Sequence, residues 1–495
     1  MGPILSVDIG STWTKAALFD LGAAPPVVLG QAQLPTTQAD LSLGFARVSC
    51  ALLGLAPETP VEEMRTEVPI HVCSSAKGGL AIAAIGIVPD LTVSVARLAA
   101  ASAGGRIDAA YAYRLTETQV AELEARQPDI VLLCGGTDGG NESFVLRNAR
   151  ALAEARLHAA FIYAGNAAMA TEVRAILRGR PLDVVPNVMP EMGTLNIEPA
   201  RAAIRGVFLR RIVEGKGLDK VAARCAAEPR PTPLAVYELM EACASWTDTV
   251  LIDMGGATTD LYSRCPCFRG EEGMVLRGLA EPDLMRTVEG DLGMRVGARS
   301  AAEAGRGYIE SRLREASFGG PDAPARFAEW IARVAEHVEV IAGTGDEEAF
   351  DDLLAEACLY HALLRHAGSV EEVWTPGGKV RVQRGKDLRG VCRIVASGGW
   401  LARRGSAAPV RQALRAARRD TGGARLLPES PALCADTDYL VPLLGNIAAR
   451  YPEAAAQLAA ACLSPMTEPA AAERGSAAEE RRAGAQVAAR ERRHA

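Results

Sequence analysis

Two stretches of the chain carry an aspartate and a glycine at the same spacing, followed by hydroxyl side chains. The first, DIGSTWTK, runs from Asp8 to Lys15, and the second, DMGGATTD, runs from Asp253 to Asp260. Apolar residues flank both stretches, so each should form a tight turn between two strands. The glycine lets the backbone approach an anion, and N–H groups and hydroxyls can hold phosphate oxygens. The aspartate suits the hydrated magnesium that accompanies ATP.

Either turn alone is a weak signal, because Asp-x-Gly turns connect strands in many proteins. Their repetition is more informative, since it suggests two duplicated halves. A third element, CRIVASGGWLA from Cys392, predicts a strand that ends at Ser397, Gly398 and Gly399 before a helix. A backbone without side chains can pass beside a purine ring there. The order of hairpin, hairpin and glycine turn therefore predicts a nucleotide site.

Alternating β-rich and alanine-rich stretches predict an α/β fold. Strands and helices alternate from about Val68 to Glu198, which predicts a parallel sheet in a separate inserted domain. We expect four segments: the first part of lobe I at 1–67, the inserted α/β domain at 68–200, a helical connection and lobe II at 201–465, and a disordered tail at 466–495.

The composition limits the class of protein. The 495 residues exceed what one hydrophobic core usually covers. A net charge of −6 argues against nucleic acid as the main partner. No apolar run is long enough to cross a bilayer, and the chain opens on a strand-like run instead of a secretory signal. We therefore expect a cytoplasmic protein without a membrane partner. The eleven cysteines show no paired C-x-x-C spacing, which predicts reduced thiols.

The hairpins and the glycine turn resemble the phosphate-1, phosphate-2 and adenosine motifs of the superfamily that contains actin, Hsp70 and sugar kinases. The resemblance implies a two-lobed, ribonuclease H-like ATPase fold that binds ATP and Mg²⁺. It implies that Asp8 holds magnesium through water, and that Asp253 is a second magnesium-side acid or orients the attacking water. The residues implied to contact the nucleotide are Gly10, Ser11, Thr12, Lys15, Gly255, Gly256, Thr258, Thr259, Gly398 and Gly399.

Within that superfamily, four stretches look like the MutL family associated with glutamate mutase: LIDMGGATTDLYS, CGGTDGGNES, NVMPEMGTLNIEPAR and RTVEGDLGMR. The resemblance spans Ile4 to Ala402. It implies that the partners are subunits of the coenzyme-B12-dependent mutase that interconverts glutamate and 3-methylaspartate. As with the similar reactivating factors of diol and glycerol dehydratases, ATP binding and hydrolysis would release damaged cobalamin, with direct or indirect contact to it.

Three other functions fit the same residues. A small-molecule kinase would use the hairpins equally well, although it needs a carboxylate base that the sequence does not identify. A hydantoinase or oxoprolinase relative has a second loop similar to Gly255–Asp260. A non-hydrolysing interaction protein would use the nucleotide only as a clamp. The sequence allows two interpretations of the loop from Gly135 to Asn141. It is either a ligand-binding turn or a βα turn capped by Asn141 or Ser143.

Overall fold

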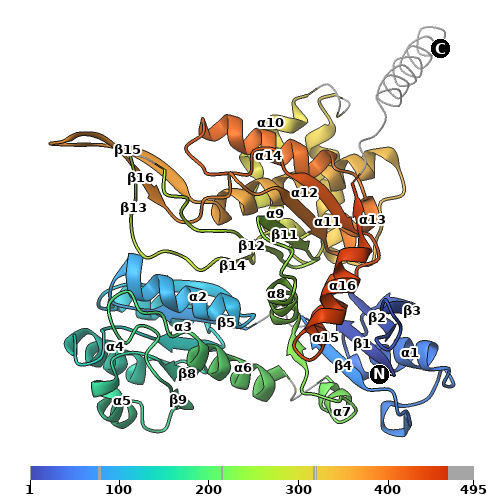
Figure 1. Cartoon of the computed structure of the whole chain (residues 1–495), viewed down its shortest axis with the longest axis horizontal. Helices are drawn as coiled ribbons and strands as arrows, with labels where there is room; N and C mark the ends of the chain where they lie inside the picture. Colours follow the sequence, from blue (N-terminus) through green and yellow to red (C-terminus); the bar gives the residue numbers. More distant parts are fainter. Residues whose placement is uncertain are drawn as a thin grey trace.

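The computed structural model describes residues 2–75, 80–212, 216–271, 273–315, 318 and 320–466. Helices pack against three large β-sheets, and a fourth, small sheet stands apart from them (Figure 1). The predicted α/β class is confirmed. Within the described ranges, no helix is long and apolar enough to cross a membrane. The predicted tail lies outside the described residues except for Met466.

The first sheet contains the N-terminal hairpin. Across the sheet its strands are β3 (Val27–Pro35), β2 (Trp13–Asp20), β1 (Pro3–Ile9), β4 (Ile70–Ser74) and β10 (Arg230–Pro231). β1 and β2 pair antiparallel, which confirms the predicted hairpin, and β4 lies parallel to β1. Helix α1 (Leu41–Leu53) packs on this sheet; it begins at Asp40, whose carboxylate accepts a hydrogen bond from Ser42 N.

The second sheet repeats this arrangement. Its strands are β14 (Leu284–Glu289), β12 (Thr259–Arg264), β11 (Thr249–Met254), β17 (Arg393–Ser397), β18 (Ala432–Asp436) and β19 (Leu463–Pro465). In both sheets, a hairpin gains an antiparallel strand on one side and parallel strands on the other. This duplicated strand order confirms the predicted two-lobed, ribonuclease H-like fold.

Helices of the second half bury an apolar core against this sheet. They are α9 (Ala298–Ala304), α10 (Arg306–Leu313), α11 (Ala323–Glu336), α12 (Gly345–His366), α13 (Gly399–Arg404) and α14 (Ala408–Thr421). The long helix α12 begins at Thr344, whose hydroxyl accepts from Glu347 N, and its first turn is acidic. Both features stabilise a helix N-terminus.

A third sheet is entirely parallel. Its strands are β6 (Arg106–Tyr111), β5 (Ala81–Ile85), β7 (Ile130–Leu133), β8 (Ala160–Tyr163) and β9 (Leu182–Val184), and its helices are α2 (Ser94–Ser102), α3 (Glu117–Arg126), α4 (Ser143–Glu154) and α5 (Ala170–Ile176). The predicted strand–helix alternation is confirmed. We call residues 80–197 the insert. The predicted start at residue 68 lies one strand too early, because β4 pairs with β1 in the first sheet.

The glycine-rich loop after β7 is held by hydrogen bonds within the insert. Asn166 Oδ1 accepts from Gly139 N at 2.9 Å, and Asn187 Nδ2 donates to Gly136 O at 3.0 Å. Asn141 Oδ1 accepts from Phe144 N at the start of α4. These contacts favour the interpretation of this loop as a capped βα turn.

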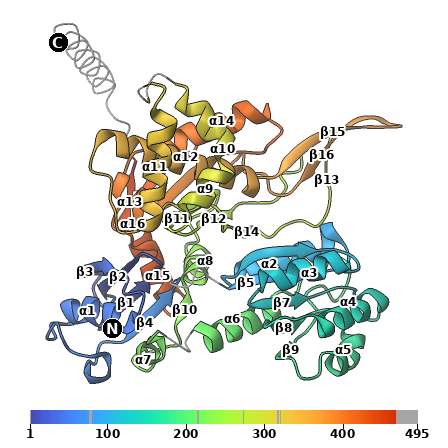
Figure 2. The same cartoon turned by 180° about the vertical axis from the view of Figure 1, so that it is seen from behind.

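The last two helices that the structure describes return to the first sheet. Helices α6 (Glu198–Ile212), α7 (Leu218–Ala222) and α8 (Thr232–Ala242) follow the insert, and α15 (Val441–Ala448) and α16 (Pro452–Cys462) follow β18. Figures 1 and 2 both show α15 beside β1 and α8. Ser6 Oγ donates to Leu443 O at 2.7 Å, and Asn446 Nδ2 donates to Ser6 Oγ and Val7 O at 3.0 Å. The two ends of the fold are therefore joined directly.

The small sheet projects from the body as an arm (Figure 1). It consists of β13 (Met274–Leu276), β16 (Gly378–Arg384) and β15 (Ser369–Thr375). Its hairpin turn contains Gly378 at φ 112°, a conformation that favours glycine, and Trp374 beside this turn is 78% exposed.

Candidate functional site

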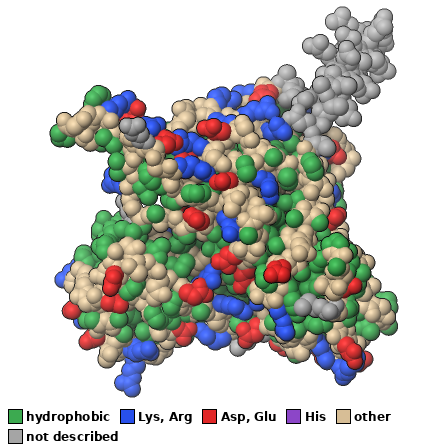
Figure 3. All heavy atoms as spheres, in the orientation of Figure 1, with side chains coloured by type: hydrophobic (Ala, Val, Ile, Leu, Met, Phe, Trp, Pro, Cys, Tyr) green, Lys and Arg blue, Asp and Glu red, His purple; other side chains and the backbone are tan. Residues whose placement is uncertain are grey.

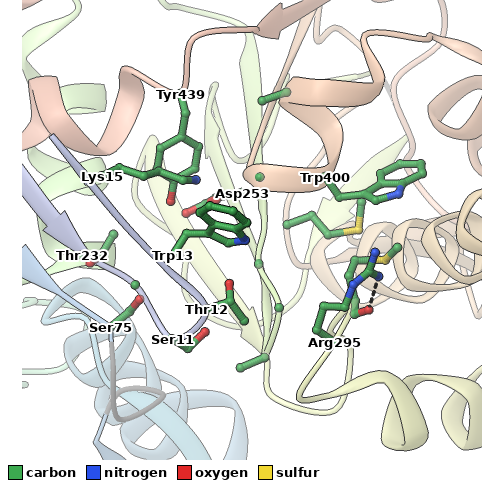
Figure 4. Close-up of a pocket in the computed structure, with 18 of the residues that line it drawn as sticks. Ser11, Thr12, Trp13, Lys15, Ser75, Thr232, Asp253, Arg295, Trp400 and Tyr439 are labelled. Carbon is green, nitrogen blue, oxygen red and sulfur yellow. Dashed lines mark hydrogen bonds between the residues drawn. The ribbon is translucent and has the colours of Figure 1, made fainter. Parts of the chain in front are cut away.

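A cavity of about 710 Å³ lies between the two hairpin turns. Figure 4 shows Trp13 and Thr12 on one side of it, and Trp400 and Arg295 on the other. The turns come close at one point, because a Cβ added to Gly256 would lie only 2.6 Å from Thr12 Cγ2. The absence of a side chain at Gly256 is therefore required for this approach.

The two turns are closed by equivalent hydrogen bonds. Gly10 N donates to Trp13 O at 3.0 Å, and Gly255 N donates to Thr258 O at 2.9 Å. In each case a glycine N–H bonds to the carbonyl three residues later, so the duplication seen in the sequence extends to backbone geometry.

The strands after the turns place a charged residue opposite each aspartate. Lys15 pairs with Asp8 across the first hairpin, and Asp260 pairs with Asp253 across the second. The first hairpin thus brings a cation beside its acid, and the second brings a further acid. The consequence is a group of carboxylates around one lysine.

Of the four aspartates Asp8, Asp253, Asp260 and Asp436, three are held by hydrogen bonds. Asp8 Oδ1 accepts from Thr232 Oγ1 at 2.7 Å and from Cys73 Sγ at 3.2 Å, and its Oδ2 accepts from Tyr439 OH at 3.2 Å. Asp436 accepts from Ser397 Oγ and from two backbone N–H groups at the start of α15. The third, Asp260, is bound by arginine as described below.

Asp253 is the exception. Within the described part of the chain, the carboxylate of Asp253 accepts no hydrogen bond. This residue is partly exposed and lines the cavity. Burial, followed by the negative charges of Asp260 and Asp8, raises the pKa of Asp253 to about 7. Lys15 offsets this rise only in part. A carboxylate with unused lone pairs at a cavity wall is suited to bind a cation or to accept a proton.

Lys15 is buried beside an aromatic ring. Its Nζ lies 2.9 Å from the centroid of the Tyr439 ring, which is a cation–π contact. Burial lowers the pKa of Lys15 to about 8, while Asp8 and Asp253 favour the charged form. Tyr439 itself has φ 54°, an unfavourable backbone conformation for a residue other than glycine. This strained position lets the tyrosine contact both Lys15 and Asp8.

The structure brings most of the predicted residues to the cavity wall. Those that line it are Gly10, Ser11, Thr12, Lys15, Asp253, Gly255, Gly256, Thr258 and Gly399.

Three predicted residues do not line the cavity. Asp8 is 1% exposed and fully engaged by its hydrogen bonds. Thr259 begins β12 and faces the core, where its hydroxyl donates to Leu292 O at 2.7 Å, because side chains alternate between the two faces of a strand. Gly398 at φ 98° passes so close to the second hairpin that a Cβ would lie 2.2 Å from Met254 O, so it shapes the turn instead.

Sequence reasoning missed the aromatic and basic side chains around the cavity. Trp13, Trp400, Tyr439 and Arg295 line it. Trp13 lies inside the first motif, and Trp400 directly follows the glycine turn, so their positions could have identified them. Arg295 ends the stretch RTVEGDLGMR, so its position carried a signal too, whereas Tyr439 carried none.

A chain of hydrogen bonds leads from the cavity to the insert. Thr258 Oγ1 donates to Asp260 Oδ2 at 3.3 Å, and Arg286 of β14 donates to Asp260 Oδ1 through Nε at 3.0 Å and Nη2 at 2.5 Å. Arg286 Nη1 donates to Ala101 O at 2.7 Å and to Gly105 O at 3.1 Å, at the end of α2. Arg286 is 3% exposed, so these contacts are shielded from water.

Comparison with known proteins gives a family match over nearly the whole chain. The model of the MutL protein family matches residues 4–463. Protein MutL of Clostridium tetanomorphum is 35% identical over 469 residues, which cover 92% of this chain and 98% of that protein.

Similarity to solved structures is much weaker. Xylulose kinase from Rhodospirillum rubrum is 14% identical with a TM-score of 0.32, over 95% of both chains. A glycerol dehydratase reactivase is 11% identical with a TM-score of 0.32, over 90% of this chain and 99% of that one. Scores of this size bear on neither activity nor partner. The family match, by contrast, includes both hairpins and the glycine turn that build the cavity, and on that match the chain belongs to the MutL family.

Proposed function

We propose that the protein is an ATP-dependent accessory protein of a coenzyme-B12-dependent mutase, and that ATP binding and hydrolysis release damaged cobalamin from this enzyme. The proposed mutase interconverts glutamate and 3-methylaspartate. The observation that carries the nucleotide part is the unpartnered carboxylate of Asp253 between two facing hairpins. Membership in the MutL family supports the choice of partner.

A nucleotide in this cavity would meet groups from both hairpins. The hydroxyls of Ser11, Thr12 and Thr258 can donate to phosphate oxygens, and Lys15 supplies a positive charge. Asp253 fits magnesium, since hard cations prefer oxygen ligands and its lone pairs are free. Bound magnesium would neutralise charge on the phosphates. If Asp253 does not hold the metal, its ionised form can orient a water or accept its proton.

The hydrogen-bond chain through Arg286 offers a way for nucleotide state to reach the insert. A phosphate that takes the hydroxyl of Thr258 competes with Asp260 for the same donor. Any shift of Asp260 moves Arg286, and with it the backbone at Ala101 and Gly105. Because the bonds are buried, a small change at one end has a large electrostatic effect at the other.

This function has a chemical rationale. Radical enzymes lose the adenosyl group in side reactions and retain inactive cobalamin. Its release requires a partner whose affinity for the enzyme differs between two states, and a two-lobed ATPase that closes on nucleotide has two such states.

We expect ATP hydrolysis to increase at least about tenfold when mutase loaded with inactive cobalamin is added, with recovery of mutase activity. Hydrolysis is followed as ADP release. The same product analysis would detect the phosphorylated metabolite that a small-molecule kinase forms, or the opened ring that a hydantoinase or oxoprolinase relative forms. Asp253→Ala and Asp8→Ala should lose the stimulated rate. Absence of nucleotide binding by the wild-type protein would refute the proposal, whereas bound but unhydrolysed ATP would indicate a nucleotide clamp.

The pH dependence of hydrolysis should be bell-shaped. The rate is expected to rise as pH approaches about 7 because the raised pKa of Asp253 leaves its carboxyl protonated below that value. It should fall above about pH 8 as Lys15, with its lowered pKa, loses its charge. The measurement is the rate at subsaturating ATP from about pH 5.5 to 9.5. Lys15→Arg should move the alkaline limb to higher pH, and an unchanged limb would contradict the assignment to Lys15.

A further inference from the structure

A second cavity, of about 940 Å³, lies between the insert and the second sheet. Helix α2 and strand β6 form one wall, and β14 with the segment before it and the end of α12 form the other. Figures 1 and 2 both show β14 passing α2 at this place. We call this cavity the insert groove. Its volume lies within the range of about 300–1,000 Å³ typical of small-molecule sites.

The insert groove is basic although the protein is acidic. Eight arginines and four carboxylates line it, whereas the whole chain has a net charge of −6. Three of these carboxylates, Asp108, Glu289 and Asp291, are already paired with arginines. By contrast, Figure 3 shows acidic and basic side chains interspersed over the face of the molecule seen there. Some of the arginines are paired with carboxylates outside the groove, such as Arg286 with Asp260 and Arg384 with Glu371, so the excess positive charge rests on the arginines without an acidic partner.

Two arginines of the groove are uncommitted. Arg97 lies on the insert wall and Arg277 on the opposite wall, and in the described ranges neither guanidinium group donates a hydrogen bond or forms an ion pair. Burial raises the pKa of Glu281 on the opposite wall, and the charges of Lys386 and then of Arg97 partly offset this rise. Both arginines line the same cavity, so a ligand that fills it would meet both of them.

Two further side chains are held at the groove. A Cβ on Gly290 would lie 2.5 Å from Arg106 Cδ, so the stem of Arg106 packs directly on the backbone after β14. His366 is 2% exposed, and its Nδ1 lies 2.8 Å from Thr287 Oγ1. Its Nε2 is buried and has no partner among the described residues. Buried polar atoms are almost always hydrogen-bonded, so this nitrogen is an unsatisfied polar atom in the groove wall.

We propose that the insert groove binds a small phosphate-bearing anion. Guanidinium groups present paired N–H donors that match phosphate oxygens. Arg97 and Arg277 would clamp the ligand from the two walls, with Arg106 and the imidazole of His366 beside it. Such a ligand would fix the insert relative to the second sheet.

The insert groove shares a wall with the nucleotide cavity. Arg106, Arg286 and Val288 line both. A phosphate-bearing ligand in the groove would bias the same arginine that binds Asp260, so the two sites should influence each other's affinity. Binding in the groove does not itself require the proposed ATPase function.

The test is isothermal titration calorimetry of the full chain with inorganic tripolyphosphate, in EDTA and at fixed ionic strength. A Lys15→Ala background weakens binding in the first cavity. In that background, we expect Arg97→Ala/Arg277→Ala to weaken tripolyphosphate binding at least about tenfold, because two charge-assisted contacts are lost. Citrate should bind more weakly than tripolyphosphate, and tighter citrate binding would overturn the phosphate assignment.

The matched control is Arg178→Ala/Arg314→Ala, which removes one exposed arginine from the insert and one from the second lobe, outside the groove. It should change the affinity for tripolyphosphate less than about twofold, since salt screens exposed charges that lie outside the groove. An equal loss in both double variants, or no tripolyphosphate binding in the Lys15→Ala protein, would overturn the proposal. Circular dichroism tests the folding of each variant. Arg97→Lys/Arg277→Lys retains the charge, so its affinity for tripolyphosphate should lie between that of the Lys15→Ala protein and that of the Arg97→Ala/Arg277→Ala variant.

Discussion

Replacing Asp253 by asparagine should reduce ATP hydrolysis by at least about 100-fold and, at about pH 8, raise the melting temperature of the nucleotide-free protein. The first effect follows from losing the free carboxylate at the cavity wall. The second follows from its raised pKa: burial, Asp260 and Asp8 disfavour the charged form in the folded state. A neutral amide of the same shape relieves that cost. The residue would thus serve activity at the expense of stability.

The sign of the stability effect can be checked by pH. A raised carboxyl pKa in the folded state means that the protein loses stability as pH rises from about 4, the unfolded value, through about 7. The advantage of Asp253→Asn should therefore be largest above pH 7 and vanish toward pH 4. Melting temperatures across this range test it. An asparagine variant that melts lower at every pH would show that Asp253 is structural.

Asp8→Asn is the matched comparison. Asp8 is also buried, and burial raises its pKa as well, but Thr232, Lys15, Cys73 and Tyr439 oppose this rise. Unlike Asp253, its carboxylate accepts hydrogen bonds from Thr232, Cys73 and Tyr439. An amide cannot accept these bonds equally well, so we expect a loss of about 1–3 kcal/mol in the free energy of unfolding. Opposite stability effects of the same chemical change would separate the free carboxylate from the held one.

Arg286→Met should lower the free energy of unfolding by about 3–5 kcal/mol, because it leaves Asp260 buried without its cation and removes one donor from each of two carbonyls of the insert. Urea denaturation measures this loss. Adding Asp260→Asn removes the uncompensated charge and should recover much of the stability. The double variant would still lack the link between Thr258 and the insert.

Hydrogen exchange distinguishes this link from a purely structural role. In the wild type, nucleotide should change the protection of amides near Ala101 and Gly105, and in Arg286→Met/Asp260→Asn this change should be lost while nucleotide still binds. Arg312→Met, which breaks a pair with Glu356 away from both cavities, is the control. It should destabilise the protein yet keep the nucleotide-dependent change. Retention of that change in the double variant would mean that coupling takes another route.

The sequence was sufficient to predict the hairpins because their information is local. Turn residues stand between apolar strands, and the second copy confirms the first. It also predicted the parallel sheet of the insert from strand–helix alternation. The assignment of β4 failed because a single buried strand shows no preference for the sheet it will join; only its pairing with β1 decides this.

The site was predictable to the extent that it lies in the turns. Residues such as Ser11 and Gly256 reach the cavity because the turns themselves form it. Thr259 and Thr258 are neighbours of identical type, and only the side-chain alternation of β12 separates their environments. Arg286 could not be predicted, because its carbonyl partners lie 185 and 181 residues earlier in the chain.

The return of α15 to β1 has a consequence for synthesis. Ile4 and Phe19 are translated well before Leu443 and Ile447, with which they share a core cluster. The first lobe therefore cannot complete its core until α15 has been translated. Nascent or prematurely terminated chains that end before Val441 would expose this apolar face, which makes them substrates for chaperones and proteases.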